Sequence, residues 1–328
     1  MPSLSDLYTL PLDDWIEALV KDWLVPNFRP AFRAIQWPVD QVLSGTESTL
    51  LAIPFVLFVV LAGLVAWWIA GRGVALFTAI SLAFLDLLGI WSETMTTLAM
   101  VLTAVVFCAV VGIPMGILAA RSDRFAAAIR PVLDIMQTTP AFVYLVPVVM
   151  LFGVGMVPGI IATIIFALPP IIRLTNLGIR QVRGELVEAG FAFGATPRQV
   201  LLEIQMPLAM RTIMAGLNQT LMLSLSMVVI AALIGAEGLG LIVFRGIGRL
   251  DVGLAALGGI GIVLLAIMLD RITQAMGDTE ARIKAGQRRQ ALLARIGLAR
   301  ATSAQAPGEP APRAQEQPEP QNPKGGIA

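Results

Sequence analysis

The sequence of 328 residues contains no histidine, a single cysteine and only three lysines. Without histidine the chain cannot build a Ser-His-Asp or Cys-His nucleophile, and Cys108 alone forms neither an internal disulfide nor a zinc site. The dipeptide Gly-Lys never occurs, so the phosphate-binding loop G-x-x-x-x-G-K-S/T of many ATPases is missing. We therefore expect no catalytic residue, no metal, no cofactor and no ATP hydrolysis through such a loop in this chain.

Charged residues are also scarce. They make up 14% of the sequence against 57% for hydrophobic residues, and the mean hydropathy is +0.80. The net charge is +1, and no basic run is interleaved with aromatic residues, so nucleic-acid binding is not expected. Because the core of a soluble domain cannot bury so large an apolar share, the composition predicts an all-α, polytopic membrane protein.

Apolar windows of about the length that crosses a bilayer recur along the chain. A spanning helix needs roughly 20 mostly apolar residues, and seven windows reach or approach that length. The second and fifth windows are short or contain proline, so either can be partly re-entrant. We predict about seven transmembrane helices, at Thr49–Ala70, Val74–Ile90, Thr97–Ala120, Leu133–Phe152, Val157–Leu174, Thr212–Ile234 and Val252–Asp270.

The distribution of lysine and arginine predicts the orientation. Nine of these residues follow Asp270, and five lie in the loop Arg173–Arg211. The positive-inside rule places both segments in the cytoplasm, which puts the N-terminus outside and the C-terminus inside. Arg245 and Arg249 fall on the outer side and disagree with the rule.

Composition divides the chain into four segments. Residues 1–48 form an acidic, extracytoplasmic extension, in which Asp14–Leu24 predicts an interfacial amphipathic helix with Trp15 and Trp23 on one face. Residues 49–94 hold two spans, and residues 95–277 hold the remaining spans and a long cytoplasmic loop. Residues 278–328 are basic and then rich in Pro and Ala, which predicts a disordered cytoplasmic tail.

The long loop, residues 185–207, predicts a helix, a sharp turn and a second short helix. Gly194 can end the first helix in a left-handed conformation. Thr196 can cap the second, with Pro197 at its first position and Gln199 completing a capping box. The loop carries more apolar residues than an isolated loop helix should expose, which indicates a partner groove. These residues are Phe191, Phe193, Val200, Leu201 and Leu202.

The same loop resembles the EAA loop of ABC-importer permeases, whose pattern is E-A-A, three residues, G, nine residues and I-x-L-P. Glycine stands in place of the second alanine, and methionine in place of the leucine. The resemblance implies a type I ABC-importer permease fold in which the loop docks on a separate ATPase. The implied coupling residues are Glu188, Ala189, Gly190, Gly194, Ala195, Thr196, Pro197, Ile204 and Pro207.

Further segments are similar to the permease family of glycine betaine/proline betaine importers: Met136–Pro147, Ile165–Thr175, Gly216–Met222 and Arg245–Asp251. This similarity is close over roughly Thr97–Gly277. It implies a permease homodimer in the bacterial inner membrane, two copies of a cytoplasmic ATP-binding subunit and an external solute-binding protein. The implied solute is a quaternary-ammonium osmoprotectant such as glycine betaine, proline betaine or choline.

Polar residues inside the predicted spans are candidates for the translocation path, because hydrocarbon makes them costly. Tyr144, with Phe142 nearby, can offer a π-face to a trimethylammonium group. Hydrogen bonding between helices is the alternative role for this set. The candidates are Gln137, Thr138, Thr139, Phe142, Tyr144, Asn218 and Gln219.

Two other functions compete with the importer. A secondary transporter driven by Na⁺ or H⁺ would need internal repeats and carboxylates near the membrane midplane, and neither is evident. A membrane-embedded enzyme would need a catalytic set of polar residues, which the sequence does not supply.

Overall fold

The computed structural model describes residues 12–277, and every regular element in that range is helical. The predicted tail at 278–328 and the first 11 residues of the extension lie outside the described residues. In chain order the elements are α1 (Leu12–Glu17), η2 (Ala18–Leu24), α2 (Val25–Ala52), α3 (Phe55–Ile69), α4 (Arg72–Leu87), α5 (Trp91–Arg121), α6 (Asp123–Thr138), α7 (Ala141–Phe152), α8 (Met156–Arg180), α9 (Gly184–Ala192), α10 (Pro197–Gln199), η3 (Val200–Gln205), α11 (Met206–Ala231), η4 (Ala232–Ile234), α12 (Leu239–Gly248) and α13 (Val252–Gly277).

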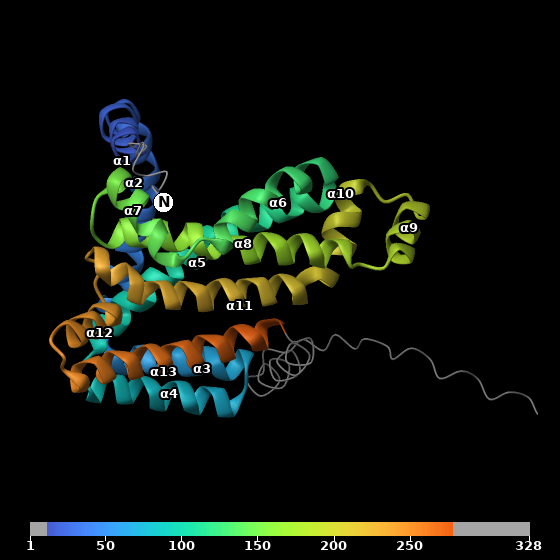
Figure 1. The fold of residues 1–328 in the computed structure, drawn as a ribbon. Helices are drawn as coiled ribbons and strands as arrows, with labels where there is room; N and C mark the ends of the chain where they lie inside the picture. The colour runs from blue at the N-terminus through green and yellow to red at the C-terminus, as the bar shows by residue number, and fades with distance from the viewer. Residues whose placement is uncertain (1–11, 278–328) are drawn as a thin grey trace, which may run out of the picture. The chain divides into compact units, whose positions relative to one another are not determined.

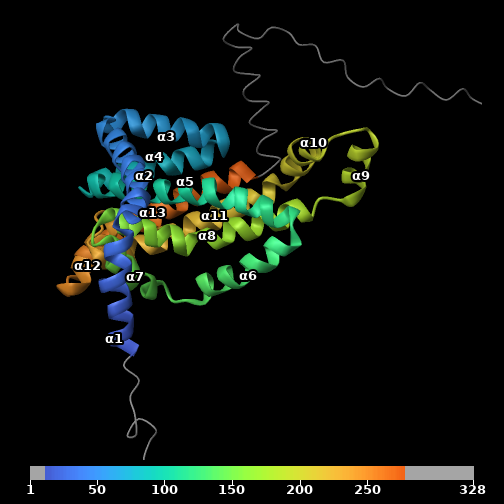
Figure 2. The ribbon, with the colours of Figure 1, turned by 90° about the horizontal axis from the view of Figure 1, so that it is seen from above.

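The centre of the bundle consists of α5, α8 and α11, which run side by side (Figures 1 and 2). Glycine makes this close approach possible. A methyl group added at Gly116 of α5 would lie 2.5 Å from Thr175 Cβ of α8, and one added at Gly178 of α8 would lie 2.9 Å from Thr212 Cβ of α11. Helices that pack without a hydrophobic driving force gain from such close contact. α8 is thus held tightly between its two neighbours.

A hairpin of α3 and α4 packs against this centre together with α13 (Figure 1). Leu82 and Leu85 of α4 join Val101 of α5 and Leu265 of α13 in one buried cluster. The two hairpin helices contain 15 and 16 residues, which corresponds to about 23 Å each at 1.5 Å per residue. The cluster explains why a window as short as the second predicted span still forms a helix beside the longer ones.

Within the described residues, four helical segments are long and apolar enough to cross a membrane unaided: Trp91–Arg121, Met156–Arg180, Pro197–Ile234 and Val252–Gly277. Two further candidates are bent pairs of helices. The all-α, multi-span architecture agrees with the sequence prediction, and the count of seven spans stays a prediction.

Two of the predicted spans are not single helices. The window Leu133–Phe152 is divided between α6 and α7, with a bend of 103° from one helix to the next. The window Thr49–Ala70 is divided between α2 and α3, with a bend of 109°. Proline causes both breaks, because it moves the preceding residue out of the helical region. Thr139 before Pro140 has ψ 126°, and Ile53 before Pro54 has ψ 123°.

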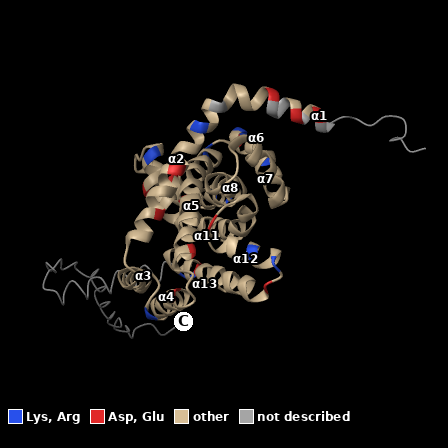
Figure 3. Ribbon diagram, turned by 90° about the vertical axis from the view of Figure 1, so that its left-hand side faces the viewer, with Lys and Arg blue, Asp and Glu red and all other residues tan. Residues whose placement is uncertain are grey.

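The N-terminal extension is one helical stretch, from α1 through η2 to α2, so its predicted boundary at residue 48 falls inside α2. The Gln36 side chain donates a hydrogen bond to the Phe152 carbonyl, and Thr96 donates one to Glu47, which ties α2 to α7 and α5. Trp15 and Trp23, assigned to an interfacial face, are both more than half exposed. Figure 3 views the molecule from the α7–α12 side and shows charged residues on α1, α2 and α12.

Candidate functional site

The loop at 185–207 folds as the sequence predicts. α9 ends at Ala192, and Gly194 follows with φ 82°, a left-handed conformation that side chains disfavour. The Phe193 amide donates to the Ala189 carbonyl and the Ala195 amide to the Gly190 carbonyl at 3.0 Å, so the last turn of α9 is closed. The turn is therefore fixed by backbone hydrogen bonds.

The second half of the loop begins with the predicted capping box. The Gln199 amide donates to Thr196 Oγ1 at 3.4 Å, and the Thr196 amide donates to Gln199 Oε1 at 2.8 Å, with Pro197 at the first helical position. The helix continues through η3 into α11 without a break, and Pro207 lies in the first turn of α11. The loop is therefore joined to α11 by continuous helix.

Gly190, which departs from the E-A-A pattern, lies where the two short helices touch. Gly190 is buried, and a methyl group added there would lie 2.6 Å from Ile204 Cδ1 and 3.4 Å from Val200 Cγ2. Val200 is 2% exposed and also belongs to this contact. The glycine thus allows α9 and η3 to approach closely around Ile204.

Apolar side chains remain uncovered on the outer side of this helix-turn-helix. Phe193 is 92% exposed, Leu202 63% and Phe191 48%. Of the five apolar residues expected to face a partner, two are instead buried: Val200 lies at the contact around Gly190 inside the loop, and Leu201 packs into the bundle with Ile179, Ala209 and Ile213. Figure 1 shows α9 and α10 at the end of the bundle away from α7 and α12. The loop is therefore a projecting element with exposed apolar side chains.

The candidate path residues on α6 and α7 gather around the break between these helices. Thr138 and Thr139 both donate to the Ile135 carbonyl, and Gln137 is exposed. Tyr144 donates to the Met136 carbonyl at 2.5 Å, and its ring lies 6.1 Å from that of Phe166. The Tyr144 hydroxyl therefore connects α7 to α6 across the break, while the neighbouring Phe142 is 60% exposed.

The candidates on α11 belong to a different polar group. Asn218 donates to Asp270 Oδ1 of α13 at 2.9 Å and accepts from Thr273 at 2.5 Å, whereas Gln219 is exposed. The predicted path residues are therefore divided between the α6–α7 break and the α11–α13 contact. The contacts of Tyr144 and Asn218 match the alternative role, hydrogen bonding between segments.

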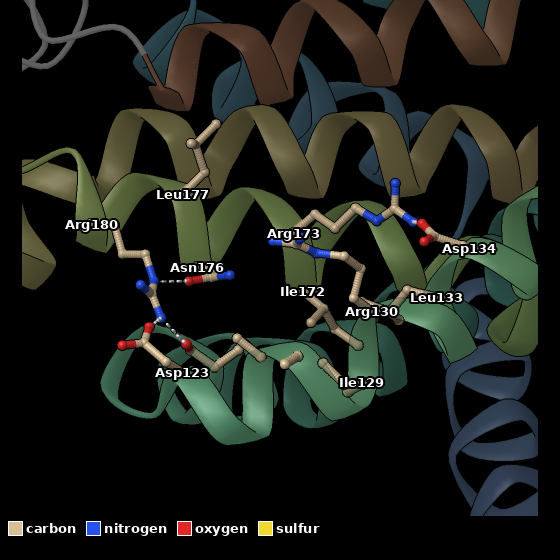
Figure 4. A pocket seen from close by; sticks show the side chains of 13 residues that line it. Asp123, Ile129, Arg130, Leu133, Asp134, Ile172, Arg173, Asn176, Leu177 and Arg180 are labelled. Atoms are coloured by element: carbon tan, nitrogen blue, oxygen red, sulfur yellow. Dashed lines mark hydrogen bonds and ion pairs between the residues drawn. The ribbon is translucent and has the colours of Figure 1, made fainter.

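A charged crevice between α6 and α8 was missed by sequence reasoning. It has a volume of about 640 Å³ and is shown in Figure 4. Two ion pairs cross from one helix to the other: Arg173 to Asp134 at 2.5 Å and Arg180 to Asp123 at 2.7 Å. The signal was present, since a spacing of seven residues on α8 and of eleven on α6 places each pair of charges on one helical face. Of these charges, only the arginines entered the sequence analysis, where they predicted the orientation.

The bundle of membrane-length helices with a projecting helix-turn-helix is the architecture of a multi-pass membrane protein. Residues 112–278 match the family "Binding-protein-dependent transport system inner membrane component", and the chain belongs to this family. It is thus an inner-membrane permease component of such a transport system, as the EAA-like loop indicated. This membership favours the importer over the secondary transporter and the membrane-embedded enzyme.

Two curated relatives illustrate the match. The chain is 57% identical to the glycine betaine/proline betaine transport system permease protein ProW of Escherichia coli (strain K12), over 88% of this chain and 81% of the relative. It is 47% identical to the glycine betaine transport system permease protein OpuAB of Bacillus subtilis (strain 168), over 83% of this chain and 96% of the relative.

A solved structure shares the fold. A chain of the MetNI methionine ABC transporter in an inward-facing conformation is 24% identical, with a TM-score of 0.52, and the match covers 59% of this chain and 95% of that chain. The two chains therefore share a fold over this range.

Proposed function

We propose that this chain is the permease subunit of an ATP-driven importer of a quaternary-ammonium osmoprotectant, glycine betaine being the solute that both relatives' names share. Two copies of the chain form the membrane dimer. A separate cytoplasmic ATP-binding subunit, also in two copies, supplies the energy, and an external solute-binding protein delivers the solute. Family membership supports the binding protein, because the family is defined by dependence on one.

One observation carries the coupling role of the loop: a structured helix-turn-helix that leaves Phe193 92% exposed at its tip. An exposed phenylalanine on a rigid element favours a partner groove, since aromatic side chains are typical anchors of interfaces. The loop holds the ATPase in this proposal, and α11 receives its motion. Closure of the ATPase dimer on ATP then tilts the helices from inward-open to outward-open, and hydrolysis resets them.

The proposal places the α9–α10 end of the bundle in the cytoplasm and the N-terminal extension outside. The exposed arginines Arg183 and Arg198 of this loop support that orientation through the positive-inside rule. The α6–α7 break, with Gln137, Thr138 and Phe142 exposed, is proposed to face the translocation path. Gln219 is assigned to the path on its exposure alone.

A substitution at Gly194 tests the coupling role. The position has open space for a side chain but a φ of 82°, and a β-branched residue held there costs about 1–3 kcal/mol. We expect Gly194→Val to remodel the turn and to reduce glycine betaine uptake about ten-fold or more, while membrane insertion and solute delivery are unaffected. ATP hydrolysis by the complex should continue without uptake.

Two control variants separate the turn from the mere addition of a side chain. Gly184→Ala adds a methyl group at the first residue of α9, just before the loop, where there is also open space and φ is not positive, and it should transport normally. Gly194→Asn should retain more uptake than Gly194→Val, because asparagine tolerates the left-handed region. Normal uptake by Gly194→Val at wild-type membrane levels would count against the proposal.

Co-purification tests the partners directly. Under mild detergent, the permease should retain a stoichiometric ATPase, and replacing Phe193 by Asp should release it. A secondary transporter would purify alone and would take up glycine betaine without ATP.

A further inference from the structure

The crevice between α6 and α8 has apolar walls and a charged rim. Ala126, Ala127 and Ile129 of α6 face Ile172 and Leu177 of α8 across it. At its two ends the ion pairs Arg173–Asp134 and Arg180–Asp123 connect the helices. Arg180 also donates through Nε to Asn176 and through Nη2 to the Ala119 carbonyl, so its guanidinium is engaged on both α8 and α5 as well as by Asp123. Two of the three crevice arginines are therefore neutralised.

Arg130 is the third. It lines the crevice one helical turn before Asp134 (Figure 4), but that carboxylate already accepts from Arg173 at 2.5 Å. No carboxylate among residues 12–277 forms an ion pair with the Arg130 guanidinium. Three guanidinium groups and two carboxylates line the space, which therefore carries one net positive charge, located on Arg130.

A net positive crevice with apolar walls suits one kind of small solute. A guanidinium binds a carboxylate through two parallel hydrogen bonds, whereas it repels an ammonium group. Alanine, isoleucine and leucine walls accept methyl groups without requiring a hydrogen bond. A solute that carries a carboxylate and a methylated ammonium group satisfies both conditions, and a methylated cation without a carboxylate satisfies only the second.

We propose that this crevice is a binding site on the inner part of the solute path, in which Arg130 holds the carboxylate of a zwitterionic solute. The site rests on the proposed function and narrows it: betaines pass, and choline, which has no carboxylate, is disfavoured. The location agrees with this role, because α8 leads from the crevice directly towards the α9–α10 loop. Arg130 is thus a specificity-determining residue.

Charge-selective labelling tests the site without reference to transport. Ala127→Cys places a thiol on the crevice wall, and the native Cys108 is fully buried. In the permease–ATPase complex, a sulfonate-bearing methanethiosulfonate should react faster than a trimethylammonium-bearing one, each rate being divided by its rate with a free thiol. Fields in clefts change encounter rates by about ten-fold or more, so Arg130→Gln should reduce the ratio several-fold.

Arg124→Gln is the matched control. It removes the same charge from an exposed position of α6 that does not line the crevice, and it should leave the labelling ratio unchanged. Millimolar glycine betaine should slow labelling of Ala127→Cys more than choline does. Equal ratios in Arg130→Gln and the wild type, or equal protection by the two solutes, would overturn the site.

Uptake in proteoliposomes with the ATPase and the binding protein separates the two proposals. Arg130→Gln should reduce glycine betaine uptake about ten-fold, which corresponds to one lost charged hydrogen-bonding partner. Arg130→Lys should recover part of the uptake. The control Arg124→Gln should match the wild type. Wild-type uptake with an unaffected Arg130→Gln would overturn the site alone. Absence of glycine betaine uptake by the wild type would overturn the proposed function and this solute assignment together.

Discussion

The two sides of α8 are built in opposite ways. Towards α5 and α11 the helix is packed so closely that a methyl group added at Gly116 or Gly178 would overlap a neighbour. Towards α6 it borders a crevice of about 640 Å³, crossed only at its ends by ion pairs. From this comparison we expect α5, α8 and α11 to move as one body and α6 to be able to move against it.

This difference relates the two proposals to each other. The tight side of α8 is the side that faces α5 and α11, and α11 continues from the coupling loop. We expect a displacement of the loop to be transmitted to α8 through these closely packed contacts. The open side of α8 is the side that faces α6, and its crevice provides space for a small solute next to α8. Coupling therefore requires the glycine contacts, and selectivity requires the crevice.

The strongest test of the tight side is Gly116→Val. The added side chain would meet Thr175 Cβ at 2.5 Å and the Ile172 carbonyl oxygen at 2.9 Å, and the backbone oxygen cannot turn aside. Overpacking of this kind costs about 1–3 kcal/mol or more. We expect a lower thermal unfolding midpoint in detergent and poor assembly, while Gly259→Val of α13, where a side chain has open space, should be unaffected. An unfolding midpoint of Gly116→Val equal to that of the wild type would contradict tight packing between α5 and α8.

On the open side of α8, loss of the ion pair between Arg173 and Asp134 should change the free energy of unfolding only slightly. Arg173 and Asp134 are 40% and 54% exposed, and pairs of this kind contribute below about 1 kcal/mol. A double-mutant cycle with Arg173→Gln and Asp134→Asn should give such a coupling energy from unfolding midpoints, and the coupling should shrink at high salt. A salt-independent coupling of several kcal/mol would show that α6 is fixed to α8.

The smallest expected effect belongs to a hydrogen bond on the tight side. Thr220 of α11 is buried and donates to the Ala167 carbonyl of α8 at 3.0 Å. Thr220→Val keeps the shape and removes the donor, which should cost about 0.6 kcal/mol, the average for contacts between membrane helices. Unlike the ion pair, this loss should not vary with salt in the same unfolding measurement. A salt-dependent loss would mean that the contact is open to water.

The coupling loop could be predicted from sequence because its geometry is local. Gly194, Thr196 and Gln199 act over at most three residues, and glycine, capping and proline rules apply to such short ranges. The exposed tip was predicted only in part, because burial of Val200 depends on the contact around Gly190 and burial of Leu201 depends on packing against α8 and α11. The glycine at position 190, a departure from the E-A-A pattern, meets the space requirement of this contact.

The α6–α7 break and the crevice were missed for two reasons. A hydropathy window averages over Pro140 and so joins α6 to α7, although the proline itself carries the signal for a break. The crevice depends on which faces of α6 and α8 oppose each other, and that is set by the bend and by tertiary packing. Asp123, Arg130 and Asp134 therefore carry no local sequence signal for a shared site, and the structure brings them together.

The side of the membrane on which the α9–α10 loop lies decides the account most directly. A cysteine placed at Ala195, with one at Val154, 73% exposed between α7 and α8, as the reference for the opposite end, can be labelled with a membrane-impermeant maleimide. In intact cells we predict labelling at position 154 only, and in inverted vesicles at position 195 only. Labelling at position 195 in intact cells would put the loop outside, beyond reach of any cytoplasmic ATPase, and would contradict the account.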